Sequence, residues 1–282
     1  MHFPQYWAKG TKDDISVWRW SDQSKEDAVR LAEQVSAAIA LKVQQGVPKS
    51  KEYEYGDRPL REEIIRDLQN IPSTALVSRN SYGCLVLNTA RIMFIDIDFD
   101  AEAANPSGRQ AGWLSTIFSK KSAATVNPDS DDSKVLHRLE DFLRLKHQWG
   151  FRVYRTAAGF RVLATHALFD PLEAESQHAL ESLGADPLYA RLCRNQKSYR
   201  ARLSPKPWRC GLSNPGVRWP FEAKAEESEF RKWLLEYEKQ SAQFATCKFI
   251  CARGNSSIPT EIQALIAVHD KETRCDSSQP LA

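Results

Sequence analysis

Phe94-Ile95-Asp96-Ile97-Asp98-Phe99-Asp100 is the stretch that decides how this chain folds and what chemistry it carries. It follows Ile92 and Met93, and this apolar run predicts a buried strand. Asp96 and Asp98 are two residues apart, so an extended chain points both carboxylates to one face. Two such acids repel each other unless a cation or hydrogen-bond donors compensate them. The strand therefore predicts a catalytic Mg²⁺ or Mn²⁺ site at Asp96 and Asp98; the alternative is a strand that simply ends in solvent.

The composition limits the classes of protein to which the chain belongs. Of its 282 residues, 42% are hydrophobic and 27% are charged, as in a soluble globular protein with a substantial core. No apolar run is long enough to span a bilayer, and residues 1–7 lack the basic and apolar regions of a signal peptide. The six cysteines are scattered and form no CxxC pair. We therefore expect a cytoplasmic protein with reduced thiols and no membrane partner.

Positive charge is concentrated in one segment. The formal net charge is only +3, but residues 187–221 contain eight basic residues and no acidic residue. Such a segment favours a phosphate-bearing partner, either a nucleoside triphosphate or a nucleic acid, DNA or RNA. The alternatives are a solvated basic surface and arginines that pair directly with the acidic residues. The residues expected to contact nucleic acid are Arg191, Arg194, Lys197, Lys206, Trp208 and Arg209.

The order of the predicted elements indicates the fold class. The sequence predicts strand 91–99, helix 134–147, the hairpin strands 151–156 and 160–166, helices 172–183 and 187–195, and strand 198–203. This order is the split βαβ, or ferredoxin-like, arrangement that RNA-recognition modules and polymerase palms also use. We therefore predict an α+β fold with a ferredoxin/RRM-like core. Arg200 and Arg202 share one face of its last strand and are expected to contact phosphates.

Further elements flank this core. N-terminal to it we expect strand 15–20, helices beginning at residues 24 and 57, and strands 74–78 and 84–88. C-terminal to it we expect helix 230–237, strand 244–252, helix 261–268 and a disordered tail from about residue 271. Residues 100–133 are rich in small and polar residues and are expected to form a flexible insertion. The predicted regions are an N-terminal α/β region (1–83), a core (84–220) and a C-terminal extension (221–282).

Three kinds of enzyme use two acids spaced in this way. A polymerase-like site holds two divalent ions that activate a hydroxyl and neutralise nucleotide phosphates. A haloacid-dehalogenase-type phosphatase uses the first acid, here Asp96, as nucleophile. A glycosyltransferase holds a metal on a sugar nucleotide. The phosphatase needs a later strand that ends in paired acids, and the glycosyltransferase needs a nucleotide-binding α/β unit before the motif. Neither is evident, so the polymerase-like interpretation is favoured.

These residues also carry a family resemblance. Phe94-Ile-Asp-Ile-Asp98, followed by Tyr154-Arg-Thr-Ala-Ala-Gly-Phe-Arg161, resembles the catalytic core of the archaeo-eukaryotic primase superfamily, the primase–polymerases, over residues 84–220. The resemblance implies that Asp96 and Asp98 bind metal and that the turn with Thr156 and Gly159 contacts nucleotide phosphates. Arg161 stands where the family usually has His; an arginine can clamp a triphosphate but cannot shuttle protons.

The family's third acid has no clear counterpart. Asp170 is a weak candidate, since it also suits a turn before Pro171, and His166 is a weak candidate for a base or ligand. The first hypothesis is a metal-dependent nucleotidyltransferase that acts on nucleoside triphosphates and nucleic acid. The alternatives are a non-catalytic nucleic-acid-binding protein with a degenerate polymerase-type fold, and a phosphatase that uses the paired acids.

Overall fold

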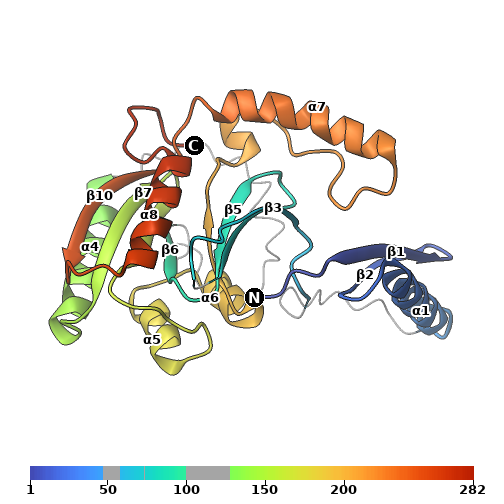
Figure 1. The fold of residues 1–282 in the computed structure, drawn as a ribbon, viewed down its shortest axis with the longest axis horizontal. Coiled ribbons are helices and arrows are strands. Elements are labelled where there is room, and N and C mark those ends of the chain that lie inside the picture. Colours follow the sequence, from blue (N-terminus) through green and yellow to red (C-terminus); the bar gives the residue numbers. More distant parts are fainter. Residues whose placement is uncertain (47–57, 73, 100–127) are drawn as a thin grey trace.

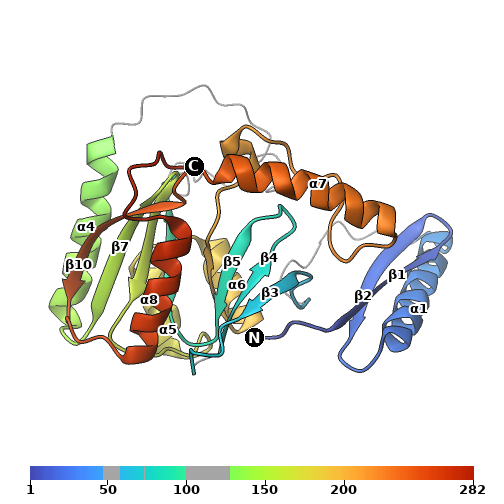
Figure 2. The same cartoon turned by 45° about the horizontal axis from the view of Figure 1, so that its top comes forward.

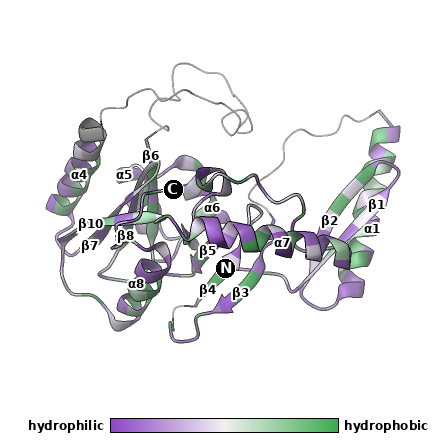
Figure 3. Ribbon diagram, turned by 90° about the horizontal axis from the view of Figure 1, so that it is seen from above, coloured by the Kyte–Doolittle hydropathy of each residue, from purple (hydrophilic) through white to green (hydrophobic). Residues whose placement is uncertain are grey.

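The computed structural model describes residues 1–46, 58–72, 74–99 and 128–282, and these residues form an α+β fold. Two four-stranded antiparallel sheets lie side by side, and a hairpin with one helix lies apart from them (Figure 1). Figure 2 shows helix α7 (Lys224–Ser241) running from the sheets toward this hairpin. The helices α4 (Pro128–Leu145) and α7 are largely hydrophilic in Figure 3, as expected for helices that cover the protein with one face only.

The first sheet holds the acid-bearing strand. Its order is β10 (Cys247–Gly254), β7 (Gly150–Thr156), β8 (Gly159–Ala164) and β6 (Phe94–Asp98). Helix α4 covers one face, where the Phe142 ring lies 5.9 Å from that of Phe151. Helix α8 (Thr260–Thr273) covers the other, where the His269 ring lies 5.3 Å from that of Phe94. Burial on both faces explains the apolar residues of β6, β7 and β8, whereas the edge strand β10 is largely exposed.

The second sheet consists of three strands that precede β6 in the chain and one strand that follows β8. Its order is β3 (Glu63–Asp67), β4 (Ala75–Arg79), β5 (Leu85–Thr89) and β9 (Tyr199–Arg202). Alternate residues on its inner face, Val77, Leu87 and Ala201, are buried in the same core as the first sheet. Residues on the opposite face include the polar Asn88 and Arg200, which are register partners.

Helices α5 (Ala174–Ser182) and α6 (Pro187–Gln196) lead into β9, and α6 lies where the two sheets meet. The Tyr189 hydroxyl is 2.8 Å from the Phe94 carbonyl oxygen of β6 and 3.2 Å from the Arg200 carbonyl oxygen of β9. The Asp186 backbone N–H donates to the Asp96 carbonyl at 2.9 Å. Strand β6 pairs with β8 of the hairpin, and β9 pairs with β5 in the second sheet. Tyr189 of α6 therefore bridges the edges of β6 and β9.

The N-terminal unit consists of β1 (Tyr6–Lys12), β2 (Ile15–Ser21) and α1 (Lys25–Gln44). Ser24 caps α1 by accepting from the Asp27 backbone N–H at 3.1 Å, as its position predicts. A Cβ atom at Gly10 would lie 2.3 Å from the Ala32 backbone, so glycine permits the close packing of hairpin and helix. An ion pair of 2.8 Å between Lys9 and Glu222 ties this unit to the segment before α7.

Several predictions about the flanking segments are wrong. Residues 63–67 form strand β3 and not part of a helix; Ile64 and Ile65 are both exposed, on a short edge strand. The predicted insertion ends earlier than residue 133, because α4 begins at Pro128, while residues 100–127 lie outside the described residues. The predicted disordered tail is ordered: α8 continues to Thr273, and Ala245 pairs with Leu281.

The predicted region boundaries separate strands that pair with each other. Strands β3 and β4 precede residue 84 but belong to the sheet of β5 and β9, and β10 follows residue 220 but pairs with β7. Within the described part of the chain, no helix combines the length and the apolar character needed to cross a membrane.

Candidate functional site

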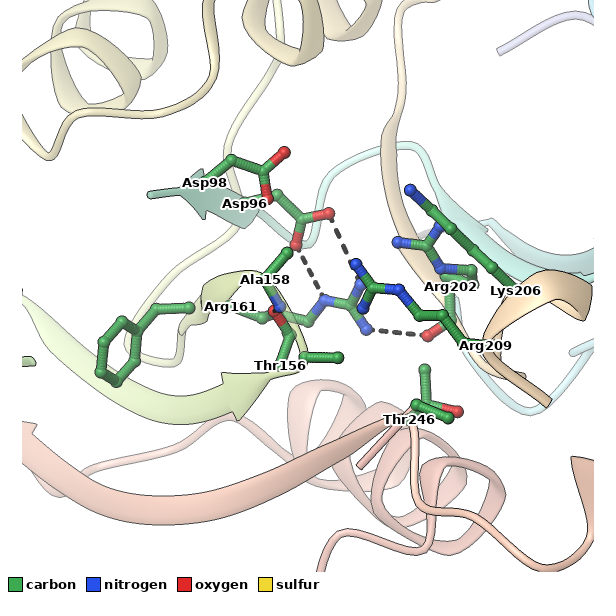
Figure 4. A pocket seen from close by; sticks show the side chains of 12 residues that line it. Asp96, Asp98, Thr156, Ala158, Arg161, Arg202, Lys206, Arg209 and Thr246 are labelled. Carbon is green, nitrogen blue, oxygen red and sulfur yellow. Dashed lines mark hydrogen bonds and ion pairs between the residues drawn. The ribbon is translucent and has the colours of Figure 1, made fainter. Parts of the chain in front are cut away.

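A small pocket lies where β6 ends beside the turn between β7 and β8. It is lined by Asp96, Asp98, Thr156, Ala157, Ala158, Phe160, Arg161, Arg202, Lys206, Arg209, Thr246 and Ala282. Figure 4 shows the two acids on one side and Arg202 and Lys206 on the other, with Arg161 between them. The pocket volume is about 70 Å³, well below the several hundred Å³ of sites that enclose an organic ligand. An ion or a phosphate group fits inside, but a whole nucleotide does not.

Asp96 is bound by an arginine of the neighbouring strand. Asp96 and Arg161 are direct register partners of β6 and β8, and the Arg161 Nε donates to Asp96 Oδ1 at 2.9 Å. Its Nη1 donates to the Arg202 carbonyl oxygen at 2.8 Å, and only 1% of Arg161 is exposed. Burial alone would lower the pKa of Arg161, but the Asp96 carboxylate outweighs it and raises this pKa. The protein itself therefore compensates one of the two predicted acids.

Asp98 has a different environment. Its side chain reaches solvent at the pocket mouth and has no hydrogen-bond or ion-pair partner among the described residues. The surrounding protein, together with the carboxylates of Asp96 and Asp186, raises the pKa of Asp98. Lys206 and Arg202 partly oppose this shift. Asp98 is consequently the acid whose oxygens are available to a cation or a ligand.

Three basic side chains line the pocket opposite Asp98. Arg202 comes from β9, and Lys206 and Arg209 come from the turn that contains the short 3₁₀ helix η1 (Pro207–Cys210). Burial and the charges of Arg202 and Arg209 lower the pKa of Lys206 to about 8, against the attraction of Asp98. Because Arg161 is already balanced by Asp96, Asp98 faces the basic side chains of Arg202, Lys206 and Arg209 across the pocket. The pocket is therefore suited to an anion such as a phosphate group, next to one available carboxylate.

The turn between β7 and β8, where Thr156 and Gly159 are the predicted phosphate contacts, forms another wall of the pocket. Thr156 lines the pocket, and the Phe99 backbone N–H fixes the turn by donating to the Ala158 carbonyl at 3.1 Å. A Cβ atom at Gly159 would lie 1.9 Å from the Ile97 carbonyl oxygen. Glycine at this position is thus needed for the close approach of β8 to β6, which is a structural reason for this residue.

The other sequence-predicted residues lie outside the pocket. Arg200 shares a face with Arg202, but its guanidinium binds the Glu62 carboxylate at 2.6 and 2.7 Å. His166 accepts from the Gly150 backbone N–H, and Asp170 accepts from the Leu172 backbone N–H. Neither weak candidate lines the pocket. Of the predicted nucleic-acid contacts, Arg191 and Arg194 are exposed on α6, and Lys197 is exposed just after it.

Sequence reasoning missed an acid whose charge acts on the predicted pair. Asp186 caps α6 by accepting from the Tyr189 backbone N–H at 2.7 Å, and its charge contributes to the raised pKa of Asp98. The only sequence signal is an Asp before Pro187, which is typical of a helix start. In the described ranges, no three His, Cys, Asp or Glu side chains group closely enough to hold a metal ion by themselves. Asp186 is therefore a neighbour of the site and not a third ligand.

Comparisons of this chain with protein-family models, with curated proteins and with solved structures found no match.

Proposed function

We propose that this chain is a metal-dependent nucleotidyltransferase that acts on a nucleoside triphosphate and nucleic acid. The observation that carries the proposal is the position of Asp98 opposite Arg202, Lys206 and Arg209 in a pocket of phosphate size. Mg²⁺ is commonly held by one or two carboxylates together with the phosphates of the substrate, so a cage of three protein ligands is not required. The resemblance of the β6 motif and the β7–β8 hairpin to the primase–polymerases supports the same reaction class.

In this proposal the basic and the acidic residues of the pocket have different roles. Arg202, Lys206 and Arg209 bind the triphosphate and stabilise the negative charge that develops on the leaving pyrophosphate. Asp98, with the lone pairs of Asp96 that Arg161 does not engage, would hold a divalent ion, and that ion would supply charge neutralisation and activation of the attacking hydroxyl. Arg161 fixes the orientation of Asp96 from a fully buried position. The pairing of β6 with β8 supports the ferredoxin-like core that we propose for this region, whereas β9 lies in the second sheet.

A second candidate is a protein that binds nucleotide or nucleic acid without turnover. The ion pair between Asp96 and Arg161 favours it, since one of the two acids is already engaged, and so does the lack of a three-residue metal cluster in the described part of the chain. Binding in this case depends on Arg202, Lys206 and Arg209 but not on Asp98.

The test is incorporation of a labelled nucleotide into a primer or template strand in Mn²⁺ or Mg²⁺. We expect incorporation by the wild type, none by Asp98→Asn, and wild-type activity for the control Lys232→Met, an exposed position in α7. Asp98→Asn is a better probe than an Asp96 variant, because loss of Asp96 leaves the buried Arg161 charge unpaired. Nucleotide binding that survives in Asp98→Asn, with no turnover by the wild type in either metal, would establish the second candidate instead.

A further inference from the structure

An exposed tryptophan stands beside the phosphate pocket. Trp208 lies between Lys206 and Arg209 in the chain, and both of these residues line the pocket. Its neighbours Pro207 and Cys210 are buried, whereas 43% of Trp208 is exposed. The Lys206 Nζ lies 5.2 Å from the centre of the Trp208 ring. One lysine therefore contacts both the pocket and the aromatic ring.

The Trp208 ring is held in place from one side. Tyr82, in the turn between β4 and β5, packs against it edge to face, with ring centres 5.3 Å apart at 84°. The Tyr82 backbone is itself fixed, because its N–H donates to Asn80 Oδ1 at 3.0 Å. Contact with Tyr82 and Lys206 leaves much of the ring in solvent. A fixed, exposed aromatic ring next to a basic pocket is the arrangement on which nucleic-acid bases stack.

We propose that Trp208 is the base-stacking subsite for a nucleotide whose phosphates occupy the pocket. This inference rests on the proposed function and extends it from phosphate to base. A pocket of about 70 Å³ has no room for a base, so the base of any bound nucleotide lies outside it. Tyr199, another aromatic residue of the basic segment, is fully buried and offers no ring surface. Stacking is tolerant of base identity, so all four bases are expected to bind alike.

The energetic consequence is specific to ligands that carry a base. Tripolyphosphate engages Arg202, Lys206 and Arg209 but has nothing to place on Trp208, whereas ATP engages both parts. Stacking of one base on an aromatic side chain raises affinity by about 5- to 150-fold. The ratio of the ATP affinity to the tripolyphosphate affinity therefore measures the contribution of base stacking, separately from that of the phosphate contacts.

The experiment is calorimetric titration of wild type, Trp208→Leu and Trp208→Phe with Mg²⁺–ATP and with Mg²⁺–tripolyphosphate. We expect wild type to bind ATP at least about fivefold more tightly than tripolyphosphate. Trp208→Leu should lose that difference while its tripolyphosphate affinity stays within about twofold of wild type, and Trp208→Phe should retain most of it. The control is Trp18→Leu, a half-buried tryptophan of the β1–β2 hairpin, which should keep the wild-type ratio.

The two proposals fail in different ways. Equal ATP affinity in wild type and Trp208→Leu, with tripolyphosphate still bound, would overturn the stacking subsite and leave the phosphate pocket intact. If wild type binds neither ligand, the proposed phosphate site is wrong, and the stacking subsite that depends on it is wrong too. Thermal melting of each variant checks that the chain is folded, and Trp208→Phe keeps the comparison valid if Trp208→Leu does not fold.

Discussion

Lys206 provides a direct test of the electrostatics of the pocket, because its charge should destabilise the fold that it serves. Its ammonium group is largely surrounded by protein, between the charges of Arg202 and Arg209. Substitution Lys206→Met removes the charge and keeps the length of the aliphatic chain. We therefore expect the variant to be more stable than wild type near pH 7 while it binds tripolyphosphate more weakly.

The magnitude follows from the pKa of Lys206, which is lowered from 10.5 to about 8. A shift of this size corresponds to about 3 kcal/mol of unfavourable free energy for the charged form, at about 1.4 kcal/mol for each pH unit. Loss of the contact with Trp208 costs about 0.5–1 kcal/mol in return. The net gain in unfolding free energy is then about 2 kcal/mol, which raises Tm by about 3–8 °C for a chain of this size.

The pH dependence of this gain has a definite sign. Between pH 8 and 10.5 the unfolded chain binds more protons at Lys206 than the folded chain, so the stability of wild type rises with pH in this window. The advantage of Lys206→Met is full below pH 8 and disappears by pH 10.5. Urea unfolding at pH 7 and pH 9.5 in phosphate-free buffer measures it, with Lys232→Met as control. A Lys206→Met protein that is less stable than wild type at pH 7, or a difference that does not change with pH, refutes the reasoning.

Three further substitutions test the neighbouring contacts by urea unfolding. Asp98→Asn should raise the unfolding free energy at pH 7, because the raised pKa of Asp98 means that the fold disfavours its charged form. This gain in stability should be lost as the pH falls through that pKa. Asp96→Asn should lower it by about 3 kcal/mol, because the buried Arg161 charge loses its partner. Tyr189→Phe should lower it by about 1–3 kcal/mol, because the Phe94 carbonyl loses a buried donor.

The elements around the site were predictable because their patterns are strong. The β7–β8 hairpin and β6 are apolar runs with few breakers, and both faces of their sheet are covered by helices. Helix α4 follows from apolar positions at helical spacing. Strand β3 was mispredicted because the adjacent Ile64 and Ile65 fit either period in so short a segment. The tail was mispredicted because its order comes from pairing with residue 245, which no local pattern encodes.

Strand geometry determines the relative position of the two acids, whereas the position of Arg200 depends on a distant partner. Asp96 and Asp98 line one pocket, as their spacing requires. The same rule places Arg200 and Arg202 on one face, yet only Arg202 lines the pocket. Arg200 is bound by Glu62, which is 138 residues away in the chain. Its functional assignment therefore depended on a tertiary contact that a sequence pattern does not contain.

The charges of the pocket also indicate how a metal ion would enter the site. With Asp96 engaged by Arg161, a free divalent cation meets one available carboxylate and the positive charges of Arg202, Lys206 and Arg209. The positive side chains repel the cation and oppose its binding. In the proposed function a triphosphate would reverse the balance, because it would neutralise basic side chains of the pocket and supply phosphate oxygens as ligands. We infer that metal and nucleotide bind as one unit, and that the sequence motif marks a site completed by its substrate.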